Sequence, residues 1–339
     1  MAVFNPPLPL KSRKISDILF SGQNDTLKIT GTKKKVTWKS SKTSVCTVTK
    51  AGKLTGKKAG KATITATVNK KKYKCTVKVY KPAAFSGKPY VVINGNKPEF
   101  TASQKSKKKS YEKYSALDKS GRCGMAISCV GKDIMPTEKR GAIGMVKPTG
   151  WQTVKYPKYI ISDLYLYNRC HLLAYELTGE NANTKNLITG TRYMNVDGML
   201  PYENKVAQYV KKTGNHVIYR VTPIFAGSNL VVSGVHMEGY SVEDKGKGIS
   251  FNIYCYNVQP GITINYKDGS SWNNGSIKDP GEKPEPVSGK YVLNENTKKF
   301  HVPSCGSVNQ MAEGNRKYYD GSRDKLIADG YSPCGNCKP

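Results

Sequence analysis

The sequence of 339 residues has few acidic side chains and no long apolar run. It holds 24 Asp and Glu against 55 Lys and Arg, which gives a formal net charge of +31. An excess of this size favours polyanionic partners, either nucleic acid or an anionic cell surface. No segment approaches the roughly 18 consecutive apolar residues that a membrane-spanning helix requires, which excludes that class of membrane protein.

The start of the chain also lacks the features of a secretion signal. The segment MAVFNPPLPLKSRK has no long apolar core and no small-residue cleavage site, so no signal peptide is expected within it. Its prolines and basic residues are typical of a disordered lead-in. Cysteine is moderately represented, with nine residues, and three of them lie near the C-terminus. That grouping favours metal binding over disulfide formation.

Residues 14–80 consist of short alternating runs separated by Gly, Lys and Ser, which predicts a small all-β sandwich. Residues 1–80 hold 19 Lys and Arg against 2 Asp and Glu, so 17 of the 31 excess charges lie there. We expect Trp38 in the core. Cys46 and Cys75 either form a bridge or pack as small hydrophobic side chains.

The run VTWKSSKTSVCTVTKAGKLTGKKAGKATITATV in this segment resembles the bacterial immunoglobulin-like domain of group 2. The resemblance implies an adhesion or spacer module rather than a catalyst. Its lysines either attract DNA or cell-wall polymers, or they simply form a solvated basic face. Residues 81–90 then form a linker.

Segment 164–171, LYLYNRCH, begins the stretch with the strongest functional pattern. Its alternation predicts a strand that places Arg169 and His171 on one face and Cys170 on the other. One face thus presents an imidazole, which titrates near neutral pH, beside a guanidinium that matches phosphate geometry. Cys170 and His171 cannot act as a nucleophile and its base, because neighbours on a strand face opposite ways.

Three polar residues follow this strand at fixed spacings. Asn186 precedes Asn195 by nine residues, and Glu203 comes eight residues later. From Tyr202 onward the apolar positions recur at helical spacing, which places Glu203 at the edge of the buried stripe. A half-buried carboxylate costs free energy, so it usually has a partner or a function.

Residues 168–203 resemble the metal-dependent, non-specific DNA/RNA endonuclease family, and within it the streptococcal-type DNA-entry nucleases. The family motif is Asp/Asn-Arg-Gly-His, then two asparagines nine residues apart and a glutamate eight beyond. The resemblance implies an α+β domain of the ββα-metal type over residues 89–267. It makes His171 the general base, Asn195 a direct ligand of Mg²⁺, and Glu203 a partner held through water. Asn186 would be a hydrogen-bonding residue of the active site, and Arg169 would contact phosphate.

The chemistry supports this interpretation independently, because Mg²⁺ prefers oxygen ligands and keeps most of its waters. One departure from the motif is Cys170, which stands where the family usually has Gly. If that position needed a special backbone angle, Cys would cost stability. The strand pattern instead points the thiol away from the site. An isolated Arg-x-His on a strand is usually structural, but four elements at the family's spacing favour the nuclease.

Residues 267–289 are rich in Pro, Gly and Ser without apolar periodicity, which is typical of a linker. In the last module, residues 290–339, the pairs His301-x₃-Cys305 and Cys334-x₂-Cys337 flank a helical pattern from Ser322 to Gly330. Two short-spaced ligand pairs match a closed tetrahedral zinc site. A unit of this size has too little core to fold alone, and zinc binding, on the order of 10 kcal/mol, would offset the deficit.

This module resembles the metal-binding domain of Ada-type DNA repair proteins, whose pattern is Cys-x₃-Cys followed by Cys-x₂-Cys. His301 replaces the first cysteine, which accepts the alkyl group in that family. The resemblance therefore implies structural Zn²⁺ and DNA contact rather than methyl transfer, in a small α+β accessory module.

The sequence as a whole predicts a multidomain, secreted or cell-surface bacterial endonuclease. It would use catalytic Mg²⁺ and structural Zn²⁺, and would cleave DNA with little sequence preference; RNA stays open as a second substrate. Two rivals stay open as well. One is a non-catalytic surface protein that binds DNA or anionic wall polymer, and the other is a cytoplasmic zinc-dependent regulator of DNA repair. The pairing of Cys123 with Cys129 is also undecided.

Overall fold

The computed structural model describes residues 16–280 and 290–339. The expectations of a disordered basic lead-in and of no signal peptide both concern residues 1–14, which lie outside the described residues. Residues 281–289 of the expected 267–289 linker also lie outside them. The chain divides into two compact units, Met1–Ile277 and Lys278–Pro339. In the described part of the chain, no helix combines the length and the apolar character needed to cross a bilayer.

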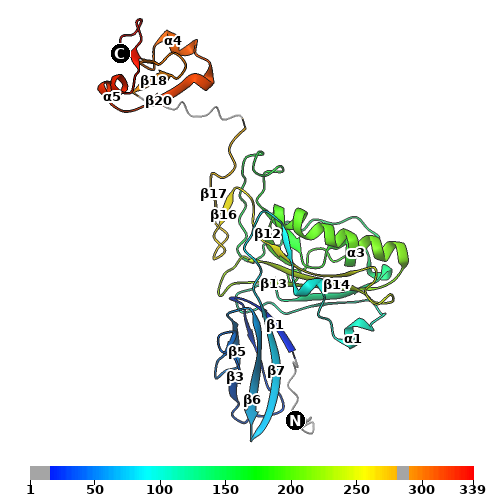
Figure 1. Ribbon diagram of the computed structural model, residues 1–339. Coiled ribbons are helices and arrows are strands. Elements are labelled where there is room, and N and C mark those ends of the chain that lie inside the picture. The colour runs from blue at the N-terminus through cyan, green and yellow to red at the C-terminus, as the bar shows by residue number, and fades with distance from the viewer. Residues whose placement is uncertain (1–15, 281–289) are drawn as a thin grey trace. The chain divides into compact units, whose positions relative to one another are not determined.

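The N-terminal part of the first unit is the predicted β-sandwich (Figure 1). One sheet has the order β1-β7-β6-β3 and the other the order β2-β5-β4. Their bounds are β1 Ser16–Phe20, β2 Asn24–Thr26, β3 Thr37–Ser40, β4 Cys46–Val48, β5 Lys53–Gly56, β6 Gly60–Val68 and β7 Lys71–Tyr80. Along β6 buried and half-buried side chains alternate, as expected for a strand with one face on a core. Cys46 and Cys75 are both buried in that core, and Trp38 packs half-buried at its edge.

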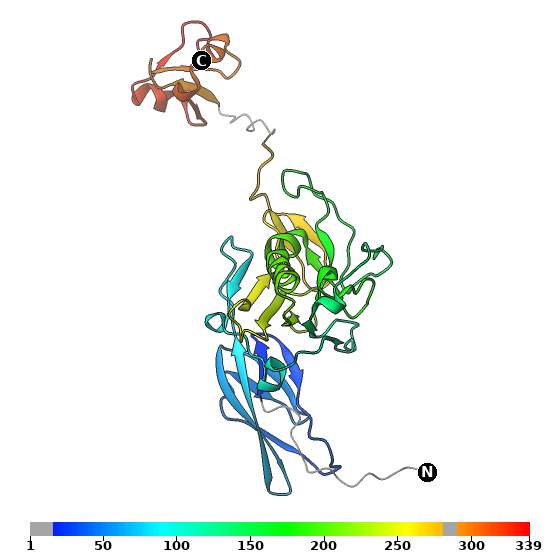
Figure 2. The same cartoon turned by 90° about the vertical axis from the view of Figure 1, so that its right-hand side faces the viewer.

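The central part of the first unit is built on a six-stranded antiparallel sheet of order β8-β15-β14-β13-β10-β9. The strands are β8 Tyr90–Val92, β9 Tyr111–Tyr114, β10 Ala126–Val130, β13 Val217–Ile224, β14 Gly234–Ser241 and β15 Ser250–Tyr256. Helix α3, Leu200–Thr213, lies along one face of this sheet (Figures 1 and 2). Val206 and Val210 of α3 join Tyr219, Val221 and Phe251 of the sheet in one buried core.

The second face of the sheet carries polar side chains that contact the N-terminal sandwich. Arg220 of β13 donates to the fully buried Glu238 of β14 from Nε at 2.7 Å and from Nη2 at 2.5 Å. Phe20 of β1 packs its ring on His236, 5.1 Å between centroids, and on Tyr254, 5.4 Å. The two parts therefore share a packed face within the first unit.

The segment expected to be a linker, residues 81–90, is also packed on the central part. Tyr256 donates a hydrogen bond to the carbonyl of Ala83 at 2.8 Å, and Phe85 makes an edge-on ring contact with Tyr256 and with Tyr193. The preceding residue Tyr80 donates to Glu99 at 2.7 Å, and Lys78 pairs with the same carboxylate. These contacts fix the connection instead of leaving it a free spacer.

Shorter elements surround the sheet and carry the loops of the candidate site. A two-stranded sheet pairs β11, Tyr167–His171, with β12, Leu187–Thr191, and a second pairs β16, Ile262–Ile264, with β17, Ser271–Asn273. The helices are η1 Asn94–Asn96, α1 Ala102–Lys105, η2 Lys132–Ile134, α2 Tyr175–Thr178 and the π-helical η3 Met194–Met199. Cys123 and Cys129 are not bridged, since they belong to different cores.

The C-terminal unit is a small α+β module. Its sheet has the order β20-β18-β19-β21, with bounds β18 Tyr291–Asn294, β19 Lys299–His301, β20 Arg316–Tyr319 and β21 Ser332–Pro333. The helices are α4 Gly306–Asn309, η4 Glu313–Asn315 and α5 Arg323–Ala328. The predicted start and stop of α5 are confirmed: Ser322 accepts a hydrogen bond from the Lys325 amide, and Gly330 follows with a φ of 87°.

Candidate active site

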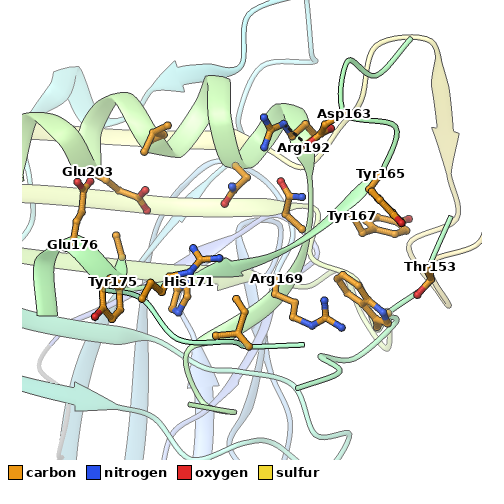
Figure 3. A pocket seen from close by; sticks show the side chains of 17 residues that line it. Thr153, Asp163, Tyr165, Tyr167, Arg169, His171, Tyr175, Glu176, Arg192 and Glu203 are labelled. Carbon is orange, nitrogen blue, oxygen red and sulfur yellow. Dashed lines mark ion pairs between the residues drawn. The ribbon is translucent and has the colours of Figure 1, made fainter. Parts of the chain in front are cut away.

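A pocket of about 720 Å³ opens beside β11, α2 and the start of α3 (Figure 3). Arg169, His171, Asn195 and Glu203, four of the five catalytic residues expected from the sequence, line it. The fifth, Asn186, does not. The remaining lining residues are Arg140, Ile143, Trp151, Thr153, Asp163, Tyr165, Tyr167, Asn168, Ala174, Tyr175, Glu176, Arg192 and Leu200.

Strand β11 separates His171 from Cys170, as its alternation predicts. Arg169 and His171 line the pocket, whereas Cys170 is fully buried in the core under the sheet. Burial raises the pKa of the Cys170 thiol, which keeps it protonated and unreactive. Gly190 on the neighbouring strand makes room for this thiol, because a Cβ there would collide with Cys170 Sγ and with Met194 Cε. Cysteine at this position therefore fits the core and leaves the pocket unchanged.

His171 is held as a neutral imidazole. Only 7% of the residue is exposed, and this burial lowers its pKa below the ordinary 6.5. Its Nε2 lies 2.8 Å from the carbonyl oxygen of Asn181. Because a carbonyl can only accept, Nε2 carries the proton and Nδ1 is left with the free lone pair. No sequence pattern singled out Asn181, because its contribution is a backbone carbonyl and leaves no side-chain signature.

Asn186 is fully buried and acts on the backbone that follows His171. Its Oδ1 accepts from the Leu173 amide at 2.8 Å, and its Nδ2 donates to the Leu173 carbonyl at 2.9 Å. The Asn186 carbonyl also accepts from the Leu172 amide at 2.8 Å. The structure thus places this side chain behind the pocket wall, where it fixes the loop between β11 and α2.

Asn195 and Glu203 come from one continuous helical segment. The π-helical turn η3 carries Asn195, and its carbonyl accepts from the amide of Leu200, five residues later. The wider turn brings Asn195 and the first turn of α3 to the same side of the pocket, and π-turns of this kind recur at functional sites. The Asn195 side chain is half-buried in the pocket wall.

Glu203 is 7% exposed and makes no hydrogen bond with another described residue. Burial, with a further contribution from the nearby Glu176, raises its pKa from 4.5 to about 8. Glu176 lies on α2, and Figure 3 shows its side chain extending toward α3, from which Glu203 projects. Burial also raises the pKa of Glu176, although Lys211 partly opposes that rise. Glu176 was not predicted from the sequence, since nothing in the motif spacing singles it out.

Three arginines surround the opening. Arg169 stacks on Trp151, with its guanidinium carbon 4.0 Å from the ring centroid, and donates to the carbonyls of Val146 at 2.5 Å and Gly144 at 2.9 Å. Arg192 pairs with Asp163 at 3.1 Å, and Arg140 lies close enough to His171 to lower its pKa further. Much of the Arg169 guanidinium is thus engaged by the backbone, which leaves Arg140 as the more available cation.

The donor atoms at the inner end of the pocket suit a hard cation. Asn195 offers an amide oxygen, and Glu203 and Glu176 offer carboxylates, which are the ligand types that Mg²⁺ takes in proteins. Oε1 of Glu176 is buried and has no hydrogen-bond partner. A buried, unpaired carboxylate oxygen is costly, so a cation with its waters would satisfy it.

Comparison with known proteins agrees with this chemistry. Residues 102–243 match the family model of the DNA/RNA non-specific endonucleases, and residues 23–79 match that of the bacterial Ig-like domain (group 2). Two segments of the chain thus match the two families that its motifs predict. No curated protein matches the chain significantly.

Two solved nucleases are each similar to about half of the chain. NucA from Streptococcus agalactiae with a magnesium ion bound is 26% identical, with a TM-score of 0.47, over 53% of this chain and 85% of that one. The Sda1 nuclease with a bound zinc ion is 26% identical, with a TM-score of 0.45, over 55% of this chain and 96% of that one.

A second group of potential metal ligands lies in the C-terminal unit. The donor atoms of His301, Cys305, Cys334 and Cys337 all lie within 4.8 Å of one another. The first three of these residues are buried, and Nδ1 of His301 is a buried atom without a hydrogen-bond partner. One imidazole and three thiols so close together form the donor set of a closed zinc site.

Proposed function

We propose that this protein is a divalent-cation-dependent endonuclease that hydrolyses phosphodiester bonds in DNA with little sequence preference; RNA stays open as a second substrate. The observation that carries the proposal is the meeting of a neutral His171 with Asn195 and Glu203 in one pocket of an endonuclease-family domain. The modules would be an Ig-like domain over residues 14–80, the nuclease over 89–267 and a zinc-binding module over 290–339.

In this proposal His171 is the general base. Nδ1 accepts the proton of the attacking water, while the hydrogen bond from Nε2 to Asn181 holds the ring and stabilises the imidazolium that forms. The lowered pKa keeps the imidazole unprotonated at neutral pH, so the base is available without deprotonation. Arg140, assisted by Arg192 and Arg169, orients the phosphate and attracts the nucleic acid.

Asn195 would hold Mg²⁺ directly, and Glu203 would hold it through water. When bound, the cation supplies positive charge that stabilises the phosphate in the transition state. Asn186 supports the site from behind by fixing the loop after His171. The side chains of the pocket present charge that suits a phosphate backbone rather than base edges, which is consistent with non-specific cleavage.

The C-terminal cluster would hold a structural Zn²⁺, which would compensate for the small core of that unit. An Ada-like module without the acceptor cysteine would support DNA contact rather than chemistry. The Ig-like domain supports the expectation of a secreted or surface-attached bacterial protein, in which this module is an adhesion or spacer element.

Digestion of supercoiled plasmid tests the proposal. We expect nicked and linear products with Mg²⁺ and none with EDTA. The Asn195→Ala variant should lose most of the activity at low Mg²⁺, because it removes the expected direct ligand. Retention of DNA without cleavage under any divalent cation would contradict the proposal and favour the non-catalytic binding protein. Equal cleavage of matched RNA and DNA would show that both are substrates.

A further inference from the structure

Glu176 has no place in the motif, yet it faces the centre of the candidate site. It is the second residue of helix α2, which follows the loop after His171, and it lines the same pocket as Asn195 and Glu203. Figure 3 shows its side chain extending from α2 toward α3, beside Glu203. Two carboxylates thus approach each other from α2 and α3.

Neither carboxylate has a protein partner that would account for this approach. Only 7% of Glu203 is exposed, and its side chain makes no hydrogen bond with another described residue. Oε1 of Glu176 is buried and unpaired. Lys211, on α3, is close enough to lower the pKa of Glu176. Its side chain is exposed, however, and it forms no ion pair with either carboxylate in the described chain.

A third polar group near them is also unsatisfied. Tyr219 of β13 is fully buried, and its hydroxyl has no hydrogen-bond partner. Both Glu203 and Glu176 contribute to the electrostatic environment of that hydroxyl. Oε1 of Glu176 and the Tyr219 hydroxyl are thus unpaired near the Glu203 carboxylate, although buried polar groups are almost always paired. A positively charged, hydrated occupant of the pocket would satisfy the two carboxylates that line it.

We propose that Glu176 is a second carboxylate of the cation site, which holds the water shell of the metal together with Glu203 while Asn195 binds the metal directly. The inference rests on the proposed function. Since Mg²⁺ keeps several waters, it needs outer acceptors to orient them, and two carboxylates on opposite helices provide these on two sides. Glu176 is then a positioning residue for the metal and its waters.

Metal affinity tests this inference without relying on activity. Mn²⁺ would be titrated into the zinc-loaded full-length protein and followed by electron paramagnetic resonance of the free ion. The Asn195→Ala variant identifies which binding event belongs to this site. We expect Glu176→Gln, which keeps the shape and removes the charge, to weaken that event about 10–100-fold. The matched control is Asp197→Asn, which removes an exposed charge two residues from Asn195 and outside the pocket lining.

The outcomes separate the two proposals. If the wild type binds Mn²⁺, Asn195→Ala abolishes the binding, and Glu176→Gln binds as tightly as Asp197→Asn, the role of Glu176 is overturned and the proposed function stands. If the wild type shows no binding event sensitive to Asn195, both are overturned.

Thermal unfolding supplies a second measurement that also reports folding. At a pH above 8, where Glu203 is ionised, the Glu176→Gln variant should melt at a higher temperature than the wild type without metal, because only one of the two side chains then carries a charge. Added Mg²⁺ should then raise its melting temperature less than that of the wild type. A variant that is less stable without metal but gains as much from Mg²⁺ would contradict the proposal.

Discussion

At the scale of single residues, burial shifts the pKa values of His171 and Glu203, the two central groups of the pocket, in opposite directions. It favours the neutral form of both, and so lowers the pKa of His171 and raises that of Glu203 to about 8. The first effect keeps a base ready for proton transfer at neutral pH. The second leaves an acidic group whose ionised form needs a positive neighbour. A metal-binding nuclease requires both properties within one pocket.

The raised pKa of Glu203 predicts how the metal-free protein depends on pH. Its folded pKa of about 8 lies above the 4.5 of an ordinary glutamate, so the folded state binds the extra proton between these values. This contribution to stability is fully present below pH 4.5 and is lost as the pH rises through 8. Glu203→Gln should therefore stabilise the metal-free protein at pH 8.5, on the order of 1–4 kcal/mol, and change little at pH 4.5. Unfolding in EDTA at the two pH values checks this; equal effects at both would contradict it.

The sequence predicted those site residues that follow from spacing. The period of a strand places Arg169 on the same face as His171, and the helical pattern places Glu203 at the edge of the buried stripe. Glu176 and the Asn181 carbonyl could not be predicted, because they reach the pocket through the path of the loop after β11. The bonds of Arg169 to the backbone also depend on where residues 144–146 pass, which no local pattern encodes.

At the scale of elements, the pairing of β11 with β12 sets the position of His171. The two strands run antiparallel, with Asn168 opposite Gly190 and His171 opposite Leu187. The core side of this pair is filled by the Cys170 thiol, which occupies the space that Gly190 leaves. Cys170, which stands where the family usually has Gly, is thus accommodated within this pair of strands.

Gly190→Ala tests this fit between the strands. The added methyl group would collide with Cys170 Sγ and should destabilise the protein by about 1–3 kcal/mol. The double variant Gly190→Ala with Cys170→Ala should recover much of that loss, since it removes the sulfur atom. A double-mutant cycle on unfolding free energies measures the coupling. Additive effects of the two substitutions would show that the side chains do not contact each other.

The C-terminal unit makes a separate prediction at this scale. One Zn²⁺ per chain should co-purify with the protein, and Cys334→Ser should remove it and expose residues 290–339 to proteolysis. The matched control is Cys129→Ser, a buried cysteine of the nuclease part, which should leave the zinc content unchanged. Metal analysis and limited proteolysis provide the readouts. A stoichiometric zinc content in Cys334→Ser would contradict the proposed ligand set.

At the scale of the whole molecule, the Ig-like domain is packed on the nuclease part rather than tethered to it. The contacts of Phe20 with His236 and Tyr254 cover the sheet face opposite α3. The sequence predicted both domains, but the linker pattern of residues 81–90 gave no sign of this packing. The apolar and aromatic residues that make the interface are few and scattered, so no periodic pattern reveals it. The net charge of +31 acts over the molecule as a whole and favours association with nucleic acid of any sequence.

The most direct test of the account is the rate of Mg²⁺-dependent plasmid cleavage by His171→Ala. Removal of the general base should slow cleavage about 10²–10⁴-fold. The matched control is His216→Ala, whose imidazole pairs with Glu243 at 2.8 Å outside the pocket and should leave the rate nearly unchanged. A His171→Ala rate equal to that of the wild type would contradict the account and place the base elsewhere.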